Sequence, residues 1–493
     1  MSASPFSDDP QAGPPSAPAV LAALWAAAGL DPSAQQRFSA TGSEPALRTS
    51  FAVGTALQAA LGAATLAATE VARLRGAAPA QARVDLIDVV RESACHFTLD
   101  GRAPAQWDKL SGLYRCGRRD DDRGDPDGDP HAWVRIHANF AHHRDGVLAL
   151  LGLQPGPATE RGAVEAALRH WSAIAFESAA AERGLVVAAV RTPAEWAAHP
   201  QAAAVAGEPL LRIERAGVAV APLAALPCSS SPQTPLSGLR VLELTRILAG
   251  PVAGRTLAAQ GADVLLVNGP HLPNIEALAE TSRGKLSALL DLRTAEGRAT
   301  LRSLVSQCDV FLQSYRPGAL DAIGFGPDEL ERLRPGIVSV SLSAYGTQGP
   351  WAGRRGFDSL VQSATGLNVA EARALGRSEP CALPLQALDF GAGYLLAFGA
   401  LAAVLHQRQQ GGSWRVRVSL AGVGRWLQQL GRIADPGAAP ALDFEAASED
   451  SDSGFGRLRA VRHAAHIDGQ RLTWRRPSMP PGAHAPAWPE RTA

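Results

Sequence analysis

Residues 236–267 read LSGLRVLELTRILAGPVAGRTLAAQGADVLLV, and this stretch decides the fold. Leu239–Leu244 and Ala262–Val267 are almost continuous apolar runs of strand length, and Pro251–Gln260 between them is typical of a helix with proline at its start. Strands that are apolar along their whole length indicate a parallel sheet covered on both faces. The stretch therefore predicts a strand–helix–strand unit of an α/β domain.

The same alternation continues along the chain. The expected elements are strand 286–292, helix 295–306, strand 309–315, helix 327–333 and strand 336–342. We predict a doubly wound, Rossmann-like parallel sheet together with a smaller α+β domain. The dinucleotide fingerprint GxGxxG is absent after the first strand, where Thr245–Pro251 reads TRILAGP, and a nicotinamide enzyme is therefore disfavoured.

Composition limits the classes of function. The 493 residues are 46% hydrophobic and 19% charged, which is enough for a large core. Basic and acidic residues both number 47, so no basic excess favours nucleic acid. The N-terminus lacks a signal-sequence pattern, the five cysteines lack disulfide or zinc spacing, and Phe390–Leu405 is short for a membrane span. We expect a soluble, cytoplasmic protein that binds neither nucleic acid nor a membrane.

Changes in composition divide the chain into six parts. The expected parts are a disordered leader 1–18, a first large part 19–220, a linker 221–235, a second large part 236–435, an acidic linker 436–455 and a tail 456–493. An internal repeat relates the two larger parts, because Val53–Thr69 and Phe390–Leu405 are both Gly-containing apolar helices that run into a strand. Their alignment places Ala52 opposite Asp389, so one copy has a methyl group where the other has a carboxylate.

Five pieces between residues 236 and 420 occur in the order and spacing of one family. They are the opening stretch 236–267, RGKLSALLDL (283–292), DVFLQSYRPGAL (309–320), SLSAYGTQGPWAGRRGFDSLVQ (341–362) and LPLQALDFGAGYLLAFGALAAVL (383–405). Together they resemble the class III CoA-transferases, the CaiB/BaiF family, which includes α-methylacyl-CoA racemases. The first half resembles the later part of the same family, so we expect a fused, rearranged pair of family domains. The resemblance implies that 19–220 is a partial copy that includes the small domain and that 236–435 is the Rossmann-like domain with the active site. Family members are interlocked dimers, which leaves an intertwined homodimer and a self-contained monomer both open.

The resemblance implies that Asp389 is the catalytic nucleophile. In the family, an aspartate at the start of a Gly-rich helix attacks an acyl-CoA thioester, giving a mixed anhydride and then an enzyme-bound thioester. The residues agree, because a helix N-terminus offers free N–H groups to an oxyanion, and Gly391 and Gly393 remove side chains where a thioester would approach. The alternative interpretation is an ordinary Asp N-cap.

Candidates for holding CoA lie in loops at strand ends, where nucleotides bind in a doubly wound sheet. They are Arg246, Ile247, Leu248, Ala249, Lys285 and Arg316. Lys285 is one of two lysines and aligns with a family lysine that contacts CoA, although a surface charge beside a turn is the alternative for it and for Arg316. Ala322 stands where formyl-CoA transferase-like members carry an arginine. CoA and acyl-CoA are expected as substrates, with no permanently bound cofactor.

Phe357 separates two branches of the family. The racemases pair the aspartate with a histidine in an A-G-H-D segment, because epimerisation needs an acid and a base. Here the segment is Arg355–Asp358 with Phe357 in place of the histidine, so CoA transfer is favoured and Asp358 is expected to be structural. The alternatives are a racemase, lyase or hydrolase on the same fold, and a non-catalytic CoA-binding scaffold.

The cluster His137, His142 and His143 matches no metal-ligand spacing. We expect these histidines to face substrate or solvent and predict no metal site. The sequence names neither the acyl group nor the acceptor acid.

Overall fold

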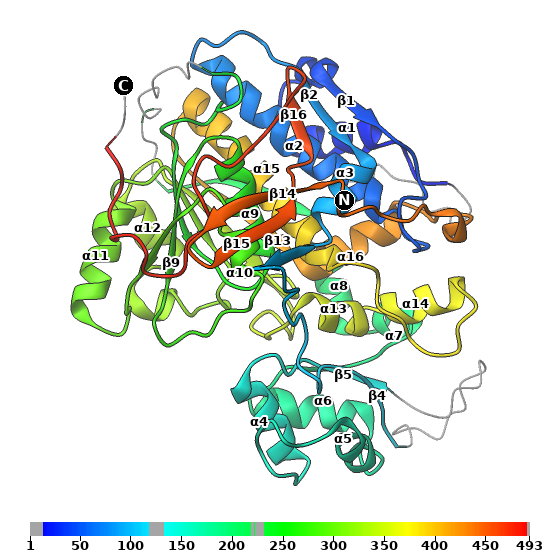
Figure 1. Cartoon of the computed structure of the whole chain (residues 1–493). Coiled ribbons are helices and arrows are strands. Elements are labelled where there is room, and N and C mark those ends of the chain that lie inside the picture. Colours follow the sequence, from blue (N-terminus) through cyan, green and yellow to red (C-terminus); the bar gives the residue numbers. More distant parts are fainter. Residues whose placement is uncertain (1–12, 118–132, 218–220, 222–230, 491–493) are drawn as a thin grey trace.

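The structure is a computed structural model that describes residues 13–117, 133–217, 221 and 231–490. Most of the leader expected over 1–18 and most of the linker expected over 221–235 therefore lie outside the described residues. Figure 1 shows a large body built on one central sheet, with a small domain below it.

Seven strands form the central sheet, in the order β10-β9-β8-β11-β12-β13-β7. The strands are β7 (Leu211–Ala216), β8 (Arg240–Leu244), β9 (Asp263–Asn268), β10 (Leu286–Leu289), β11 (Val310–Gln313), β12 (Val338–Ser343) and β13 (Ser413–Ser419). All neighbours pair in parallel except β7, which runs antiparallel to β13 at the edge. The predicted α/β class with a parallel sheet is confirmed.

Helices cover both faces of this sheet, and they are α9 (Ala249–Ala259), α15 (Ala387–Gln410), α11 (Ala295–Val305) and α12 (Pro327–Leu333). Val241 and Val310 belong to the apolar core that contains α9 and α15. Leu242 and Phe311 belong to the core that contains α11 and α12. Successive strand residues point to opposite faces, so strands covered on both sides are apolar throughout.

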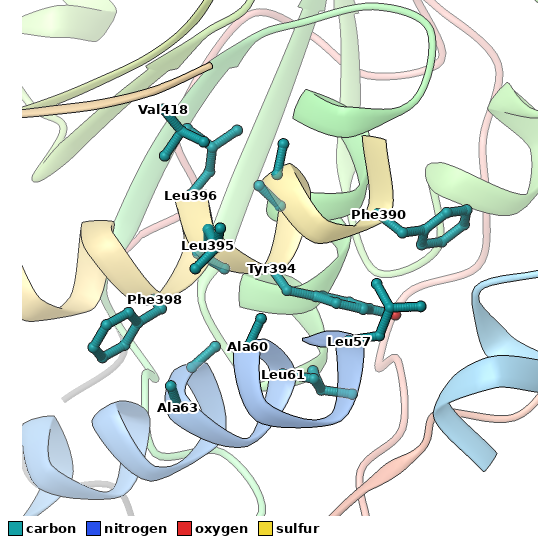
Figure 2. Close-up of a cluster of buried hydrophobic side chains, with 14 of the residues drawn as sticks. Leu57, Ala60, Leu61, Ala63, Phe390, Tyr394, Leu395, Leu396, Phe398 and Val418 are labelled. Carbon is teal, nitrogen blue, oxygen red and sulfur yellow. The ribbon is translucent and has the colours of Figure 1, made fainter. Parts of the chain in front are cut away.

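Helix α2 (Val53–Leu74) packs along α15 in the middle of the larger core. Figure 2 shows Leu57 and Leu61 of α2 on the side of α15 that carries Tyr394. Both helices are buried on nearly every side, as expected of helices that are apolar all round. α15 is long and apolar enough to cross a membrane, but the segment that meets this test is 100% buried in the protein.

Gly391 and Gly393 of α15 face packed neighbours. A Cβ at Gly393 would lie 2.7 Å from Val252 and 2.8 Å from the backbone oxygen of Ala249, and one at Gly391 would lie 3.0 Å from Val423. The interpretation that these glycines clear a path for the thioester is therefore wrong. They allow α15 to approach α9 and the helix after β13 closely.

Two smaller sheets join the ends of the chain, in the orders β1-β2-β16-β17 and β14-β15-β3. Their strands are β1 (Phe38–Thr41), β2 (Ala82–Asp85), β3 (Phe97–Leu99), β14 (Ser448–Ser453), β15 (Gly456–Val461), β16 (Ala465–Ile467) and β17 (Gln470–Arg471). β16 pairs with β2, and β15 pairs with β3. The C-terminal segment is thus hydrogen-bonded to the first half.

The acidic linker expected over 436–455 is wrong in its later part, where β14 forms. Asp450 lies opposite Arg459 in the antiparallel register of β14 and β15, and Asp452 lies opposite Arg457. Both arginines also place a side-chain nitrogen 3.3 Å from Asp450. Opposite charges on facing positions stabilise a strand pair, so this segment forms a strand without an apolar face.

The small domain consists of an antiparallel sheet, β4-β5-β6, and three helices. Its elements are β4 (Gly112–Arg115), β5 (Trp133–Ile136), β6 (Val187–Ala189), α4 (Ala141–Leu150), α5 (Arg161–Leu168) and α6 (Ala173–Glu182). Val134 and Ile136 of β5 enter its separate apolar core with Phe176 of α6. The alternate residues of β5 therefore point away from that core, towards the large body.

The remaining elements connect these parts. The helices are α1 (Ala17–Ala27), α3 (Leu86–Glu92), α7 (Pro193–Ala197), α8 (Pro200–Ala206), α10 (Leu278–Thr281), α13 (Asp358–Ala364), α14 (Leu367–Ala374) and α16 (Leu420–Gln429), with 3-10 turns at Pro32–Arg37, Asp321–Ile323 and Pro436–Ala438. α13 contacts β5 and β6, and so links the small domain to the large body.

A buried ion cluster joins three distant parts of the chain. Arg255 of α9 pairs with Glu92 of the first half at 2.9 Å and with Glu280. Arg283 also pairs with Glu280, and Glu92 accepts a hydrogen bond from the backbone N–H of Ala464 at 2.7 Å. The two halves and the C-terminal segment therefore share one cluster of buried charges.

Candidate active site

Asp389 is the third residue of α15 and is 7% exposed. The N-terminus of this helix is capped by Asp358, whose Oδ2 accepts the backbone N–H of Leu388 at 2.7 Å and that of Asp389 at 3.0 Å. Gln362 donates to the other oxygen of Asp358. The side chain of Asp389 makes no hydrogen bond to any other residue in the described ranges, so its carboxylate is free to meet a substrate.

Both carboxyl groups have perturbed acidity. Burial and the nearby Asp358 carboxylate raise the pKa of Asp389 well above its ordinary value. Burial raises the pKa of Asp358 to about 6, although its hydrogen bonds from the α15 backbone and Gln362 oppose this shift. An ionised Asp389 is therefore poorly solvated and repelled by the Asp358 carboxylate. These two effects make it more nucleophilic than an ordinary carboxylate.

A cavity of about 380 Å³ opens at Asp389. Its walls come from both halves of one chain, from residues that lie within the segments 93–97, 104–107, 135–139, 247–248, 275–277, 357–362 and 382–390. The small domain therefore closes a site whose floor is the start of α15.

A groove of about 430 Å³ adjoins this cavity, and Ile247 and Phe357 line both. Four arginines line the groove, and they are Arg246, Arg316, Arg354 and Arg355. Arg316 and Arg355 are exposed there, whereas Arg354 lies 3.3 Å from Glu177. Arginine clusters bind phosphate groups through charge-assisted hydrogen bonds.

Unusual backbone geometry gathers around the cavity. Cys95, Ile247 and Leu385 have φ of 50°, 74° and 67°, and all three line it. A β-branched residue such as Ile247 rarely adopts a left-handed conformation. Such conformations cost about 1–3 kcal/mol each and concentrate at functional sites.

The structure brings together four of the six residues expected to hold CoA. Arg246, Ile247 and Arg316 line the groove, and Leu248 lines the cavity. Ala249, by contrast, is buried in the first turn of α9 and lines neither the groove nor the cavity. Its backbone oxygen packs against α15, and its selection as a CoA contact stays a prediction.

Lys285 is also not where the sequence predicts it. Its side chain is fully buried, and its Nζ lies 2.8 Å from Glu243 Oε2 and donates to the backbone oxygen of Pro251 at 2.8 Å. Burial lowers the pKa of Lys285, while the Glu243 carboxylate opposes this shift. The prediction of a CoA contact is wrong, and so is that of a surface charge: Lys285 neutralises a buried carboxylate of β8 and holds the start of α9.

Sequence reasoning missed several arginines and aromatic residues of the two hollows. Arg354 and Arg355 directly precede the segment that contains Phe357, and this adjacency could have indicated them. Arg135 and Trp107 line the cavity from the small domain, and the signal for Arg135 was its place two residues before His137 on a strand.

The three histidines lie at these hollows, as expected for a substrate-facing position. His137 lines the cavity and stacks on Phe357 with ring centroids 4.1 Å apart, while His142 and His143 line the groove. Burial lowers the pKa of His137 to about 4 and that of His143 to about 3, so both are neutral near pH 7. In the part of the chain that the structure describes, no three His, Cys, Asp or Glu side chains are grouped to hold a metal ion.

Comparison with known proteins finds similarity to CoA-transferases over the second half of the chain. Residues 236–441 match the model of CoA-transferase family III. The acetyl-coenzyme A transferase nodX of Hypoxylon pulicicidum is 36% identical over 203 residues, which are 40% of this chain and 34% of the relative. The succinyl-CoA–D-citramalate CoA-transferase of Chloroflexus aurantiacus is 35% identical over 201 residues, which are 38% and 49% of the two chains.

A solved CaiB/BaiF family protein from Brucella suis is 26% identical, with a TM-score of 0.36 over 46% of this chain and 65% of that one. The chain spans about a third to a half of the curated relatives described above. Over residues 236–441, which are less than half of the chain, the protein is similar to CoA-transferase family III.

The buried ion pair of Lys285 with Glu243 predicts that Lys285→Met lowers the free energy of unfolding more than it weakens CoA binding. Removing one partner of a buried ion pair leaves an uncompensated charge and costs about 3–5 kcal/mol. We expect this loss in denaturant unfolding, with the KM for acyl-CoA of the folded enzyme changed less than about threefold. Lys109→Met is the matched control, because Lys109 is the other lysine and its exposed pair with Glu160 is worth about 1 kcal/mol or less. A raised KM at unchanged stability would contradict the structural role.

The carboxylate pair predicts a shifted pH dependence in Asp358→Asn. Asp389 must be ionised to attack, so activity should rise with pH through its pKa. The substitution removes the negative charge that helps to raise the pKa of Asp389, and the acid limb of the kcat/KM profile should therefore move to lower pH. Glu276→Gln is the control, because Glu276 lines the cavity but is exposed and screened. An unmoved acid limb in Asp358→Asn would contradict the coupling.

Proposed function

We propose that the protein transfers CoA from an acyl-CoA to a carboxylic acid, with Asp389 as nucleophile. The observation that carries the proposal is one carboxylate with a raised pKa, without a side-chain hydrogen-bond partner in the described residues, at a helix N-terminus in a cavity that adjoins an arginine-lined groove. The relatives named as acetyl-coenzyme A and succinyl-CoA–D-citramalate transferases support the same activity.

The reaction proceeds through covalent exchange at Asp389. The carboxylate attacks the acyl-CoA carbonyl, the C–S bond breaks, and an acyl-aspartyl anhydride and CoA thiolate result. The thiolate attacks the aspartyl carbonyl and releases the donor acid, leaving an aspartyl-CoA thioester. The acceptor carboxylate attacks this thioester and again releases the thiolate. The thiolate finally attacks the acceptor-derived carbonyl, which yields the new acyl-CoA and restores Asp389.

The arginine-lined groove and the Asp389 cavity bind different parts of CoA. The phosphates bind in the groove beside Arg246, Arg316 and Arg355, and the thiol end passes Ile247 and Phe357 to reach Asp389. The first-turn N–H groups of α15 are occupied in part by Asp358, so this carboxylate fixes the helix start that carries the nucleophile.

We also infer that the central sheet is doubly wound and that the chain pairs two family domains. The strand order, with β8 at the centre of β10-β9-β8-β11-β12-β13, supports a doubly wound, Rossmann-like sheet. The chain is a fused pair of family domains with one competent site. Ala52 precedes α2 where Asp389 begins α15, and Glu44 accepts the backbone N–H of Thr55 at 2.8 Å, which caps α2 as Asp358 caps α15. Since both walls of the cavity come from one chain, a self-contained monomer is favoured over an intertwined homodimer.

The central test is trapping of the covalent intermediate. The wild-type protein, incubated with a panel of acyl-CoAs, should gain mass as an adduct that peptide mapping locates at Asp389, with labelling that saturates near one per chain. Asp389→Ala should lose adduct and transfer while its affinity for CoA stays within a few-fold, because the phosphate contacts lie elsewhere.

Three results would overturn the proposal. These are full activity in Asp389→Ala, two adducts per chain, and transfer by residues 236–493 alone. Exchange of the substrate α-proton without any adduct would instead indicate a racemase that uses His137, which lines the same cavity.

The groove predicts that Arg316→Ala and Arg355→Ala weaken acyl-CoA binding. A charge-assisted contact is worth about 1.5–3 kcal/mol, so KM for acyl-CoA should rise about ten- to a hundredfold with little change in kcat. The effect should shrink at high salt, because both side chains are exposed. Arg332→Ala serves as control, since Arg332 is exposed but pairs with Glu329 away from the groove. An unchanged KM in both variants would place the phosphates elsewhere.

A further inference from the structure

We propose that Arg135, with His137 and Ser359, binds the reacting carboxylate of the acceptor, and that the acceptor is a monocarboxylic acid with an apolar chain. This inference rests on the proposed CoA transfer and names its second substrate. It follows from unpaired polar groups and from the distribution of charge in the cavity at Asp389.

Arg135 projects from β5 into the cavity at Asp389. Val134 and Ile136 enter the core of the small domain, so Arg135 points the opposite way and lines the cavity. Its guanidinium lies 4.9 Å from the ring centroid of Trp107, and its Nε is buried without a hydrogen-bond partner. The Asp358 carboxylate attracts it electrostatically, but the described residues give its side chain no ion pair, so this cation is available to an anionic ligand.

Two further polar atoms in the cavity are also unpaired. His137 and Ser359 are each 4% exposed, and both line the cavity. The Nδ1 of His137 and the Oγ of Ser359 have no hydrogen-bond partner among the described residues. Buried polar groups are normally hydrogen-bonded, and three unpaired groups that line one cavity therefore indicate a polar ligand.

The one cation that lines the cavity indicates that this ligand carries an anionic group. Among the described lining residues Arg135 is the single arginine or lysine, while Asp389 and Glu276 are acidic. Transfer requires an acceptor carboxylate to enter, form a bond to the carbonyl carbon of the aspartyl-CoA thioester and displace the CoA thiolate. Burying a carboxylate without a cation is expensive, and Arg135 supplies the bidentate partner that such a group prefers.

The rest of the cavity favours an apolar acid with one carboxylate. Phe97, Ile275, Leu383 and Phe390 line it together with the Trp107 ring, which is 38% exposed. A second carboxylate on the acceptor would meet these apolar walls or the acidic Glu276. A monocarboxylate with an aliphatic or aromatic chain satisfies Arg135 and places its chain against the apolar surface.

The test separates the two halves of the reaction in the full-length protein. In Arg135→Met the adduct at Asp389 should still form from acyl-CoA, and KM for acyl-CoA should stay within about threefold. KM for the acceptor acid should rise about ten- to a hundredfold, the effect of losing one charge-assisted contact. Inhibition by the released donor acid should weaken by a similar factor, because both acids use the same subsite in turn.

Arg115→Met is the matched control, because Arg115 also lies 4.9 Å from a tryptophan ring, that of Trp133, but lines neither hollow. Added guanidinium ion should restore acceptor turnover in Arg135→Ala and leave Arg115→Ala unchanged. In the wild type, apolar monocarboxylates should be accepted at lower concentration than dicarboxylates of equal length.

The outcomes distinguish the two hypotheses. Absence of any wild-type adduct would overturn CoA transfer itself. An adduct and turnover in the wild type, with an unchanged acceptor KM in a folded Arg135→Met, would overturn the role of Arg135 alone. A preference for dicarboxylates would overturn the assigned substrate class.

Discussion

The rest of the structure depends on two carboxylates, those of Asp358 and Asp389, which lie together at the start of α15. Asp358 accepts two backbone N–H groups of α15, and Asp389 stands beside it with a raised pKa and a free carboxylate. Such a pair is unfavourable in a buried place unless the surrounding elements hold it. α13 supplies Asp358 and contacts the small-domain sheet, while α9 and α2 pack along α15. The fold therefore fixes the position of an inherently unstable arrangement.

Charges inside the protein also explain why the two halves act as one unit. Arg255, Glu92 and Glu280 are almost completely buried and come from both halves of the chain. Separating the halves would leave these charges without partners, which costs more than the loss of a surface ion pair. The strand pairs β2–β16 and β3–β15 add backbone hydrogen bonds across the same boundary. A division of the sequence by composition does not divide the folded molecule.

The parallel sheet could be predicted, because strands buried on both faces show as continuous apolar runs. Asp389 could be selected because it lies inside a local motif. Lys285 could not be assigned in the same way, because its partner Glu243 is 42 residues away and the pair is formed only by the sheet. Arg135 was missed for a similar reason, since only the tertiary structure brings β5 to the start of α15. The strand at Ser448–Ser453 was hidden because its pairing depends on charge rather than on apolar residues.

The two walls of the Asp389 cavity come from residues 93–107 and 135–139 on one side and from residues 247–390 on the other, all of a single chain. For the self-contained monomer with one site proposed above, each copy of the protein succeeds or fails by itself in genetic terms. Two alleles that inactivate different walls, one at Asp389 and one at Arg135, would not complement each other when expressed together. A defective copy would equally not poison an intact one, so a cell with one functional allele would keep the activity of every intact chain it makes.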